Sequence, residues 1–434
     1  MIPEALRKAR ELDEFFQKGQ GSVKGALHGL PISVKDQFHI KGSDTTMGYV
    51  GWIGTFEGDS ATNKVGTVES QIISDLEAQG AVVFCKTSLP QTVLYDETIN
   101  HIIGQTLNPV NRHLSCGGSS GGEAALISIG GSSFGIGTDI AGSIRVPAAF
   151  CGIYGIKPSH NRFSYRGVAN TNPGQTLIPS SVGFLSTSLG SLKTVMTTLL
   201  STSPWLRDPA VVPIPWRNEA QLSTQRKLKF GIFWWDEMVQ PHPPIQRALQ
   251  MVVAALEGSG HEIMDWCPPS HTVPERLHPE IMNADENFYA LKAPMSLLEY
   301  QGRALQLRDY RQAYADYWNS TGDEYGNVVD AVLMPAAPHA AVIPRMWEHL
   351  AYTEVQNLLD YTALVIPVTH VDKNIDRPHE YVPVSAKDSR NWAAYYSAVY
   401  DGAPVGIQIV GRVCEEEKII GVAEIVEECL AMKA

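Results

Sequence analysis

Residues 116–123 read CGGSSGGE, and residues 137–145 read GTDIAGSIR. These stretches place Ser119 and Ser143 on backbone that is rich in glycine. Glycine permits positive φ values and lets bare N–H groups approach a ligand closely. Backbone N–H groups that converge beside a nucleophile can stabilise an oxyanion. A third stretch, residues 27–36 (LHGLPISVKD), ends an apolar run with a lysine. Together the three stretches raise the hypothesis of a serine–lysine hydrolase.

The composition is that of a folded globular protein. Of 434 residues, 44% are hydrophobic and 18% are charged, which is far from the disordered regime. The formal net charge of −12 argues against a nucleic-acid surface. Residues 1–18 predict an amphipathic helix without the apolar core of a signal peptide, and no stretch approaches the roughly 18 apolar residues of a membrane span. The six cysteines lack metal-type spacing, so we expect them reduced, in a soluble cytoplasmic protein.

Helices and buried strands alternate along the chain. Helices are expected at 67–79, 122–129, 244–257 and 415–429, and strands at 26–34, 81–85, 133–140, 229–233, 262–266, 330–334, 364–371 and 405–410. The run at 81–85 is continuously apolar, which is typical of a strand buried on both faces. Residues 201–217 are the best linker candidate, although their apolar content predicts that they pack on the surface. This alternation predicts a sheet covered on both sides; it does not predict the strand order.

The serine loops have three alternative interpretations. Loops rich in glycine and serine are usually plain connections, but here apolar patterns bracket them, and Asp139 and Arg145 are close enough to pair. Glu123 also lies where a helix begins, the favourable end for a carboxylate. No phosphate-binding motif is present. Residues 117–121 satisfy G-x-S-x-G, but that motif needs a strand directly before it, whereas 108–115 is rich in turn residues.

A serine–lysine arrangement needs a lysine that can lose its proton. A buried site or a neighbouring cation disfavours the ammonium form. Lys35 follows the apolar run 31–34, and Lys86 and Lys157 have similar surroundings. The residues alone favour Lys35 over Lys86 only modestly.

These stretches resemble the amidase signature family, in particular its fungal acetamidase and general amidase branch. The likeness covers most of the chain, and it is carried by residues 27–36, 117–123, 137–147, 151–158, 213–217, 241–249 and 402–411. The resemblance implies an α/β fold with one large mixed β-sheet covered by helices on both faces. It implies a single amidase domain over 1–434, with a signature core at about 27–160 and the C-terminal part of the same sheet at about 228–430. This expectation replaces the two or three domains that the length alone would favour.

The resemblance also implies a role for each site residue. Lys35 would be the base, Ser119 the bridging serine held through a cis peptide bond, and Ser143 the nucleophile. The implied substrate- and oxyanion-binding residues, the backbone donors being the last four, are Val93, Ser119, Ile140, Ala141, Gly142 and Ser143.

Three features depart from the family pattern. The chain starts at what resembles the family's last helix before the lysine strand, and residues 271–306 are abbreviated. Both differences are expected either to open the substrate channel or to impair folding. Ala141 stands where the family usually has glycine, which costs about 1 kcal/mol if that residue needs a positive φ and nothing otherwise.

The sequence therefore predicts an amidohydrolase that forms an acyl-enzyme on Ser143, with no cofactor and no metal. The expected partners are a small-molecule amide and, at most, a second copy of the chain in a homodimer; no nucleic acid or membrane span is expected. Two alternatives stay open. One is an amidotransferase-type subunit that releases ammonia for a partner, and the other is a catalytically impaired, truncated homologue.

Overall fold

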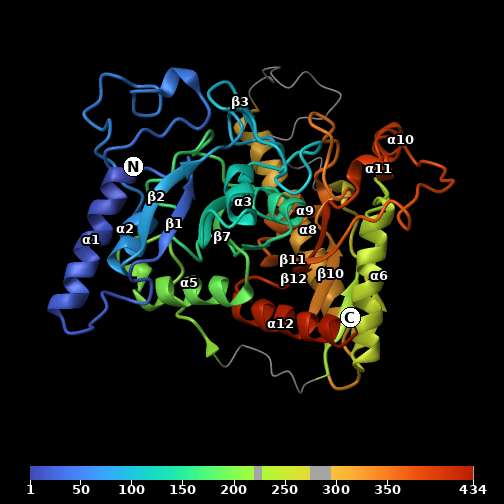
Figure 1. The fold of residues 1–434 in the computed structure, drawn as a ribbon. Coiled ribbons are helices and arrows are strands. Elements are labelled where there is room, and N and C mark those ends of the chain that lie inside the picture. Colours follow the sequence, from blue (N-terminus) through green and yellow to red (C-terminus); the bar gives the residue numbers. More distant parts are fainter. Residues whose placement is uncertain (219–226, 274–294, 434) are drawn as a thin grey trace.

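A mixed sheet of ten strands organises the chain (Figure 1). The computed structural model describes residues 1–218, 227–273 and 295–433. The strands of the sheet are β1 (Pro31–Lys35), β2 (Val82–Thr87), β5 (Phe134–Asp139), β6 (Tyr154–Lys157), β7 (Ser181–Ser186), β8 (Lys229–Ile232), β9 (Glu262–Asp265), β10 (Ala331–Pro335), β11 (Ala363–His370) and β12 (Pro404–Val410). Their order is β2-β1-β5-β7-β6-β11-β12-β10-β8-β9. A separate hairpin joins β3 (Ile99–Asn100) to β4 (Gly104–Gln105).

Parallel strands lie toward the two edges of the sheet, and antiparallel strands lie at its centre. β1 is parallel to β2 and β5, and β8 is parallel to β9 and β10. From β5 through β7, β6, β11 and β12 to β10, every pairing is antiparallel. The β6–β11 pair joins the 27–160 part of the chain to the 228–430 part within this one sheet.

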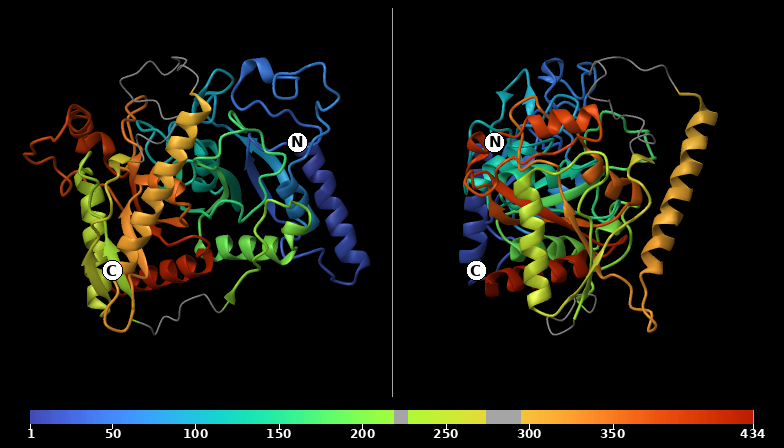
Figure 2. Two further views of the ribbon diagram at one scale, coloured as in Figure 1. Left: turned by 180° about the vertical axis from the view of Figure 1, so that it is seen from behind. Right: turned by 90° about the vertical axis from the view of Figure 1, so that its right-hand side faces the viewer.

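Helices pack around this sheet (Figure 2). They are α1 (Ile2–Lys18), α2 (Gln71–Ala78), α3 (Gly121–Ser128), α4 (Arg145–Cys151), α5 (Leu189–Ser201), α6 (Pro243–Gly258), α8 (Leu297–Ser320), α9 (Ala351–Leu359), α10 (Ala386–Ala393), α11 (Ser397–Tyr400) and α12 (Glu416–Lys433). α6 begins with the prolines expected at a helix start. α6 and α12 pack on each other and on the central strands, whereas α8 contacts α9.

Alternate residues of the central strands enter two different cores. On β10, Leu333 belongs to a large cluster that includes side chains of α6 and α12. Its neighbours Val332 and Met334 belong to a second cluster with side chains of α8 and α9. Because successive strand residues face opposite sides, helices cover both faces of the sheet. The predicted fold class is therefore confirmed.

The strand predicted at 81–85 needs a correction. It forms β2, but β2 is an edge strand rather than one buried on both faces. Val82 and Val83 are buried, while the other four residues are only partly buried. The physical reason is its position, because α1 packs along it from one side and none of the described strands pairs beyond it. The segment 201–217 packs on the protein as expected, with Arg217 hydrogen-bonded to Glu417. The abbreviated segment 271–306 lies largely outside the described residues.

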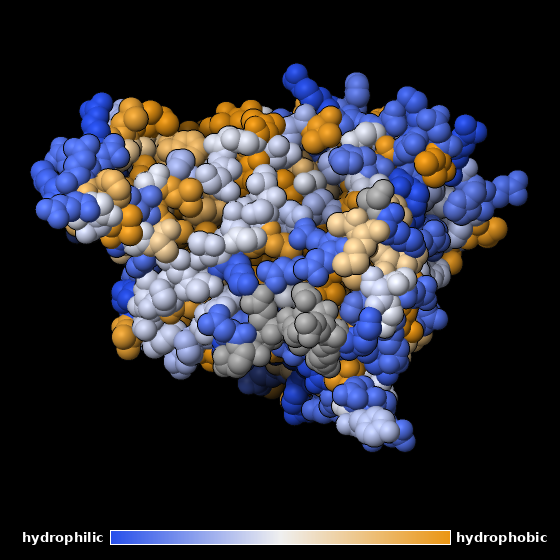
Figure 3. Space-filling model, turned by 60° about the horizontal axis from the view of Figure 1, so that its bottom comes forward, coloured by the Kyte–Doolittle hydropathy of each residue, from blue (hydrophilic) through white to orange (hydrophobic). Residues whose placement is uncertain are grey.

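The described helices include none that is long and apolar enough to cross a membrane. On the face drawn in Figure 3, apolar side chains occur in several separate groups between hydrophilic ones.

Candidate active site

Lys35 is placed by the sheet. It ends β1, opposite Thr87 at the end of β2, and β5 ends alongside at Asp139. The carboxyl ends of parallel strands meet at one edge, where open α/β sheets bind their ligands. Lys35 is completely buried there. Its Nζ donates hydrogen bonds to Ser119 Oγ at 2.7 Å and to Thr138 Oγ1 at 2.9 Å. The structure thus brings together two of the three residues predicted for catalysis.

A second layer of polar groups orients the amine of Lys35. Thr138 Oγ1 donates to Gln37 Oε1 at 2.6 Å. Gln37 Nε2 in turn donates to the Ala169 carbonyl at 2.7 Å and to Tyr165 Oη at 2.9 Å. Because the Thr138 hydroxyl donates its single proton to Gln37, it can only accept a hydrogen bond from Lys35. Neither Thr138 nor Gln37 was predicted as a site residue from the sequence, although Thr138 lies within residues 137–145 and Gln37 directly follows residues 27–36.

Burial lowers the pKa of Lys35 to about 7, although the negative charges of Asp139, Asp96 and Glu123 act in the opposite direction. A lysine with this pKa is substantially neutral near pH 7 and can accept a proton.

The other two lysine candidates are engaged elsewhere. Lys86 forms an ion pair with Asp36, with 2.8 Å between Nζ and Oδ1. Lys157 donates to the Pro158 carbonyl at 3.2 Å, and burial lowers its pKa to about 8. Among the described residues, neither lysine hydrogen-bonds to a serine of the two loops.

The two serine loops contact each other directly. The backbone N–H of Ser120 donates to the Ser143 carbonyl at 3.0 Å, and the peptide bond between Gly118 and Ser119 is cis, as the resemblance implied. Ser119 is fully buried, and Ser143 is 5% exposed. Within the described chain, no group hydrogen-bonds to Ser143 Oγ, so this hydroxyl is available to a substrate.

A buried ion pair braces the loop that carries Ser143. Asp139 and Arg145 contact each other through two hydrogen bonds of 3.0 Å, and both are fully buried. The carboxylate of Asp139 also accepts from the backbone N–H groups of Gly142 (2.8 Å) and Ile144 (3.1 Å). Burial acts to raise the pKa of Asp139, but the charge and hydrogen bonds of Arg145 outweigh it and lower the value to about 2. The pairing predicted from the sequence is confirmed.

Arg145 extends this brace to distant parts of the chain. Nη1 donates to Gln356 Oε1 (3.1 Å) and Gln408 Oε1 (3.0 Å), and Nη2, which also contacts Asp139, lies within hydrogen-bond distance of Thr353 O (2.7 Å) and Asn357 Oδ1 (2.6 Å). Every donor of a buried guanidinium needs such an acceptor. None of these partners was predicted from the sequence. In the structure, α9 is buried along its whole length although it carries several polar side chains.

Three of the four predicted oxyanion donors keep a free N–H. The described part of the chain offers no hydrogen-bond partner to the backbone N–H groups of Ile140, Ala141 and Ser143. The N–H of Gly142 is already bound to Asp139, and its φ of 138° is one that favours glycine. Ala141 is not among the residues with positive φ, so the alanine at this position costs no backbone strain.

Val93 lies in a small apolar cluster. It is 7% exposed and packs with Met47, Leu89 and Ala169. Its φ of 67° follows a φ of 74° at Thr92, and such values are rare for β-branched residues. Strained backbone of this kind concentrates at functional sites.

A histidine–aspartate pair lies elsewhere in the core. His349 Nε2 contacts Asp236 Oδ2 closely, and both side chains are buried. This pair was not predicted from the sequence. In the described residues, His349 makes no hydrogen bond to Ser119 or Ser143, so it is not placed as their base.

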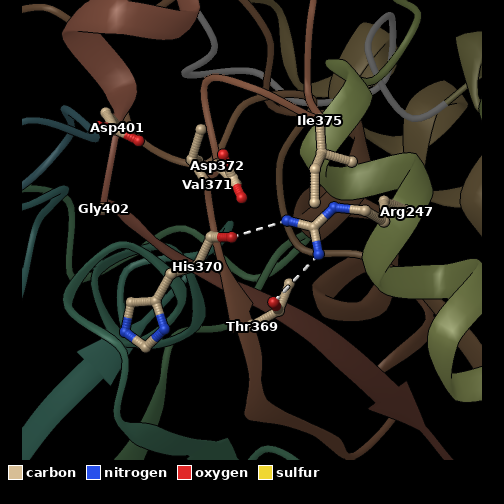
Figure 4. A pocket seen from close by; sticks show the side chains of 8 residues that line it. All are labelled: Arg247, Thr369, His370, Val371, Asp372, Ile375, Asp401 and Gly402. Carbon is tan, nitrogen blue, oxygen red and sulfur yellow. Dashed lines mark hydrogen bonds between the residues drawn. The ribbon is translucent and has the colours of Figure 1, made fainter.

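A surface pocket of about 460 Å³ is formed by other residues (Figure 4). Arg247 stands in it, but its guanidinium already donates to Asp376, to Thr369 Oγ1 and to the His370 carbonyl. None of the residues that line this pocket belongs to the serine loops. No cluster of metal-ligating side chains occurs within the described ranges.

A buried serine–lysine contact on a mixed α/β sheet, beside open backbone amides, is the arrangement of a hydrolase that acts on acyl compounds. The comparisons agree. The Amidase family profile matches residues 1–293 and 282–420. An acetamidase of Aspergillus oryzae is 41% identical over 98% of this chain and 81% of its own length. An acetamidase of Emericella nidulans is 39% identical, again over 98% and 81%.

Among solved structures, a fatty acid amide hydrolase superposes with a TM-score of 0.90 and 29% identity, over 99% of this chain and 78% of that one. The chain belongs to the amidase family, and it is a hydrolase that acts on amide C–N bonds.

Proposed function

We propose that this chain hydrolyses small or medium linear carboxamides to a carboxylic acid and ammonia or an amine, through an acyl-enzyme on Ser143. The observation that carries this proposal is the 2.7 Å contact between Lys35 Nζ and Ser119 Oγ in a buried site, on a loop that is hydrogen-bonded to the Ser143 loop. The names of the relatives, acetamidase and fatty acid amide hydrolase, support amides as the substrate class.

The first half of the reaction forms the acyl-enzyme. Neutral Lys35 accepts the proton of Ser119, which accepts that of Ser143 as Ser143 Oγ attacks the carboxamide carbon. The N–H groups of Ile140, Ala141 and Ser143 donate to the developing oxyanion. Collapse of the tetrahedral intermediate breaks the C–N bond, and the proton held by Lys35 returns through Ser119 to the leaving nitrogen.

The second half releases the acid. Water adds to the acyl carbon while Lys35 and Ser119 take its proton, and Ser143 leaves as the restored hydroxyl. Thr138 and Gln37 keep the amine of Lys35 in place throughout. Thr138 donates its proton to Gln37 and accepts a hydrogen bond from Lys35, so the amine is held between Thr138 and Ser119.

The test compares Ser143→Ala with Ser181→Ala. Ser181 is a buried serine of β7 that pairs with Asp139, and its hydroxyl has no hydrogen-bond partner among the described residues, so it is a matched control. Ser143→Ala is expected to abolish ammonia release from acetamide, propionamide and benzamide and to abolish labelling by a fluorophosphonate. Lys35→Ala should be equally inactive and Ser119→Ala nearly so. The proposal would be refuted if Ser143→Ala hydrolysed these amides as fast as the Ser181→Ala control does.

The cellular location of the enzyme and its oligomeric state remain predictions. All six cysteines are free, which supports the proposed cytoplasmic location. The proposed homodimer would be checked by the mass of the protein in solution.

A further inference from the structure

Asp96 is a buried carboxyl that the proposed reaction does not use. It follows β2 in the chain, and only 8% of its surface is exposed. Among the described residues, no group hydrogen-bonds to its carboxyl oxygens. Its oxygens are not among the fully enclosed side-chain atoms that lack a partner, so the carboxyl reaches the small part of the residue that is exposed. A carboxyl in so narrow an opening needs a hydrogen-bond partner that approaches from there, because leaving it unpaired when that opening is filled is costly.

The backbone at Asp96 packs against the loop that carries Ser119. A Cβ added at Gly118 would lie 2.7 Å from the Tyr95 carbonyl oxygen and 2.8 Å from the Asp96 carbonyl carbon. Only a glycine tolerates so close an approach. Three residues before Asp96 along the chain stands Val93, which the family resemblance implies to be a substrate-binding residue. Asp96 therefore belongs to a segment that contains this implied substrate-binding residue and packs against the loop of Ser119.

The charges around Asp96 are already committed to other partners. Burial, followed by repulsion from Asp139, raises its pKa well above the ordinary value, while Arg145 and Lys35 act to lower it and Glu97 to raise it. Lys35 donates instead to Ser119 and Thr138, and the five N–H groups of the Arg145 guanidinium are shared among Asp139 and the oxygens of α9 and β12 described above. Neither cation therefore supplies the hydrogen bond that Asp96 lacks.

We propose that Asp96 is a specificity-determining residue, which hydrogen-bonds to a hydroxyl or amino group on the acyl part of the substrate. This inference rests on the proposed amide hydrolysis and narrows its substrates to carboxamides whose acyl group carries a hydrogen-bond donor. A hydrocarbon of the same size would leave the carboxyl unpaired in the complex. Binding sites with such a buried polar group discriminate against a substrate analogue that lacks the hydrogen-bonding group.

The experiment measures kcat/KM for propionamide, lactamide, 3-hydroxypropionamide and β-alaninamide. The readout is the ratio of the best donor-bearing amide to propionamide. We expect this ratio to be about tenfold or more in the unmodified enzyme, since an unpaired buried carboxyl costs more than a factor of five. Asp96→Leu and Asp96→Ala remove the acceptor and should lower the ratio by about tenfold. Asp96→Asn keeps an acceptor oxygen and should retain the preference for a hydroxyl-bearing amide.

Fluorophosphonate labelling of Ser143 reports whether each variant keeps an intact catalytic site. A ratio that is unchanged in either Asp96→Leu or Asp96→Ala, with labelling intact, overturns the inference while leaving amide hydrolysis standing. The inference is also overturned if Asp96→Asn loses the preference for a hydroxyl-bearing amide as completely as Asp96→Ala does. If the unmodified enzyme hydrolyses none of the four amides, nor acetamide and benzamide, the proposed function itself fails.

Discussion

Replacing Lys35 by methionine should stabilise the protein while abolishing its activity. Methionine has a similar length and no charge, so it can fill the buried space at the end of β1. The amine of Lys35 has a pKa of about 7 in the folded protein and an ordinary value of 10.5. The unfolded chain therefore holds this proton more tightly than the folded one does, and folding must pull it off or bury the ammonium group.

The size of this penalty follows from the two pKa values. At about 1.4 kcal/mol for each pH unit, the gap between 10.5 and about 7 amounts to about 5 kcal/mol. The penalty is full below pH 7, shrinks as the pH rises through the window between 7 and 10.5, and is absent above it. The loss of the hydrogen bonds to Ser119 and Thr138 costs about 1–3 kcal/mol in the opposite direction, but this cost does not vary with pH.

Urea unfolding of the unmodified protein and of Lys35→Met, at pH 6, 7, 8, 9 and 10, separates the two effects. The difference in unfolding free energy should favour Lys35→Met most at pH 6 to 7 and should fall by about 1.4 kcal/mol per pH unit between pH 7.5 and 10. A difference that stays flat over this range would show that Lys35 keeps its ordinary pKa when folded. It would then be an ammonium group at neutral pH, and the proposed base would be wrong.

Three further outcomes are expected. A plot of kcat/KM against pH should rise through an apparent pKa of about 7, that of Lys35 in the free enzyme; a limb near the ordinary lysine value would contradict it. Arg145→Met should cost about 3–5 kcal/mol of unfolding free energy in urea, because it leaves the buried carboxylate of Asp139 without its cation, whereas a cost below 1 kcal/mol would mean that the brace is dispensable. Ala141→Gly should leave kcat/KM unchanged and lower stability by about 0.4–1 kcal/mol, since Ala141 has no positive φ; a clear gain in activity would show that its methyl group obstructs the site.

The local elements of the fold could be predicted because their signals are local. Apolar runs and helical periodicity gave the strands and helices that bracket both serine loops, and the Asp139–Arg145 pair needed only six residues of separation. Glu123 shows where local reasoning stops. Its place at the start of α3 was predicted, yet its carboxyl is hydrogen-bonded to Ser33 and Thr87 on two strands, and burial raises its pKa to about 7.

The rest depends on contacts between distant segments. The strand order depends on how the sheet packs, and the sequence pattern does not contain this information. The pattern therefore did not predict that the run at 81–85 lies at an edge of the sheet. The partners of Arg145 on α9 lie more than two hundred residues away from it, and nothing in either segment identifies the other. The residues next to Asp96 in the sequence do not mark it as a site residue. It becomes a candidate only in the structure, where its carboxyl lacks a hydrogen-bond partner among the described residues and its backbone packs against the loop of Ser119.

The brace at Arg145 has a consequence for the order in which the enzyme becomes competent. The loop with the proposed nucleophile lies at residues 139–145, but the most distant oxygen that holds its arginine is that of Gln408 on β12. During synthesis, residues 139–145 leave the ribosome long before these acceptors exist. Until they arrive, the guanidinium lacks four of its acceptors and the loop lacks its anchor to the sheet. The growing polypeptide therefore carries all three proposed catalytic side chains without a settled site, and hydrolytic capacity is acquired only after Gln408 has been synthesised.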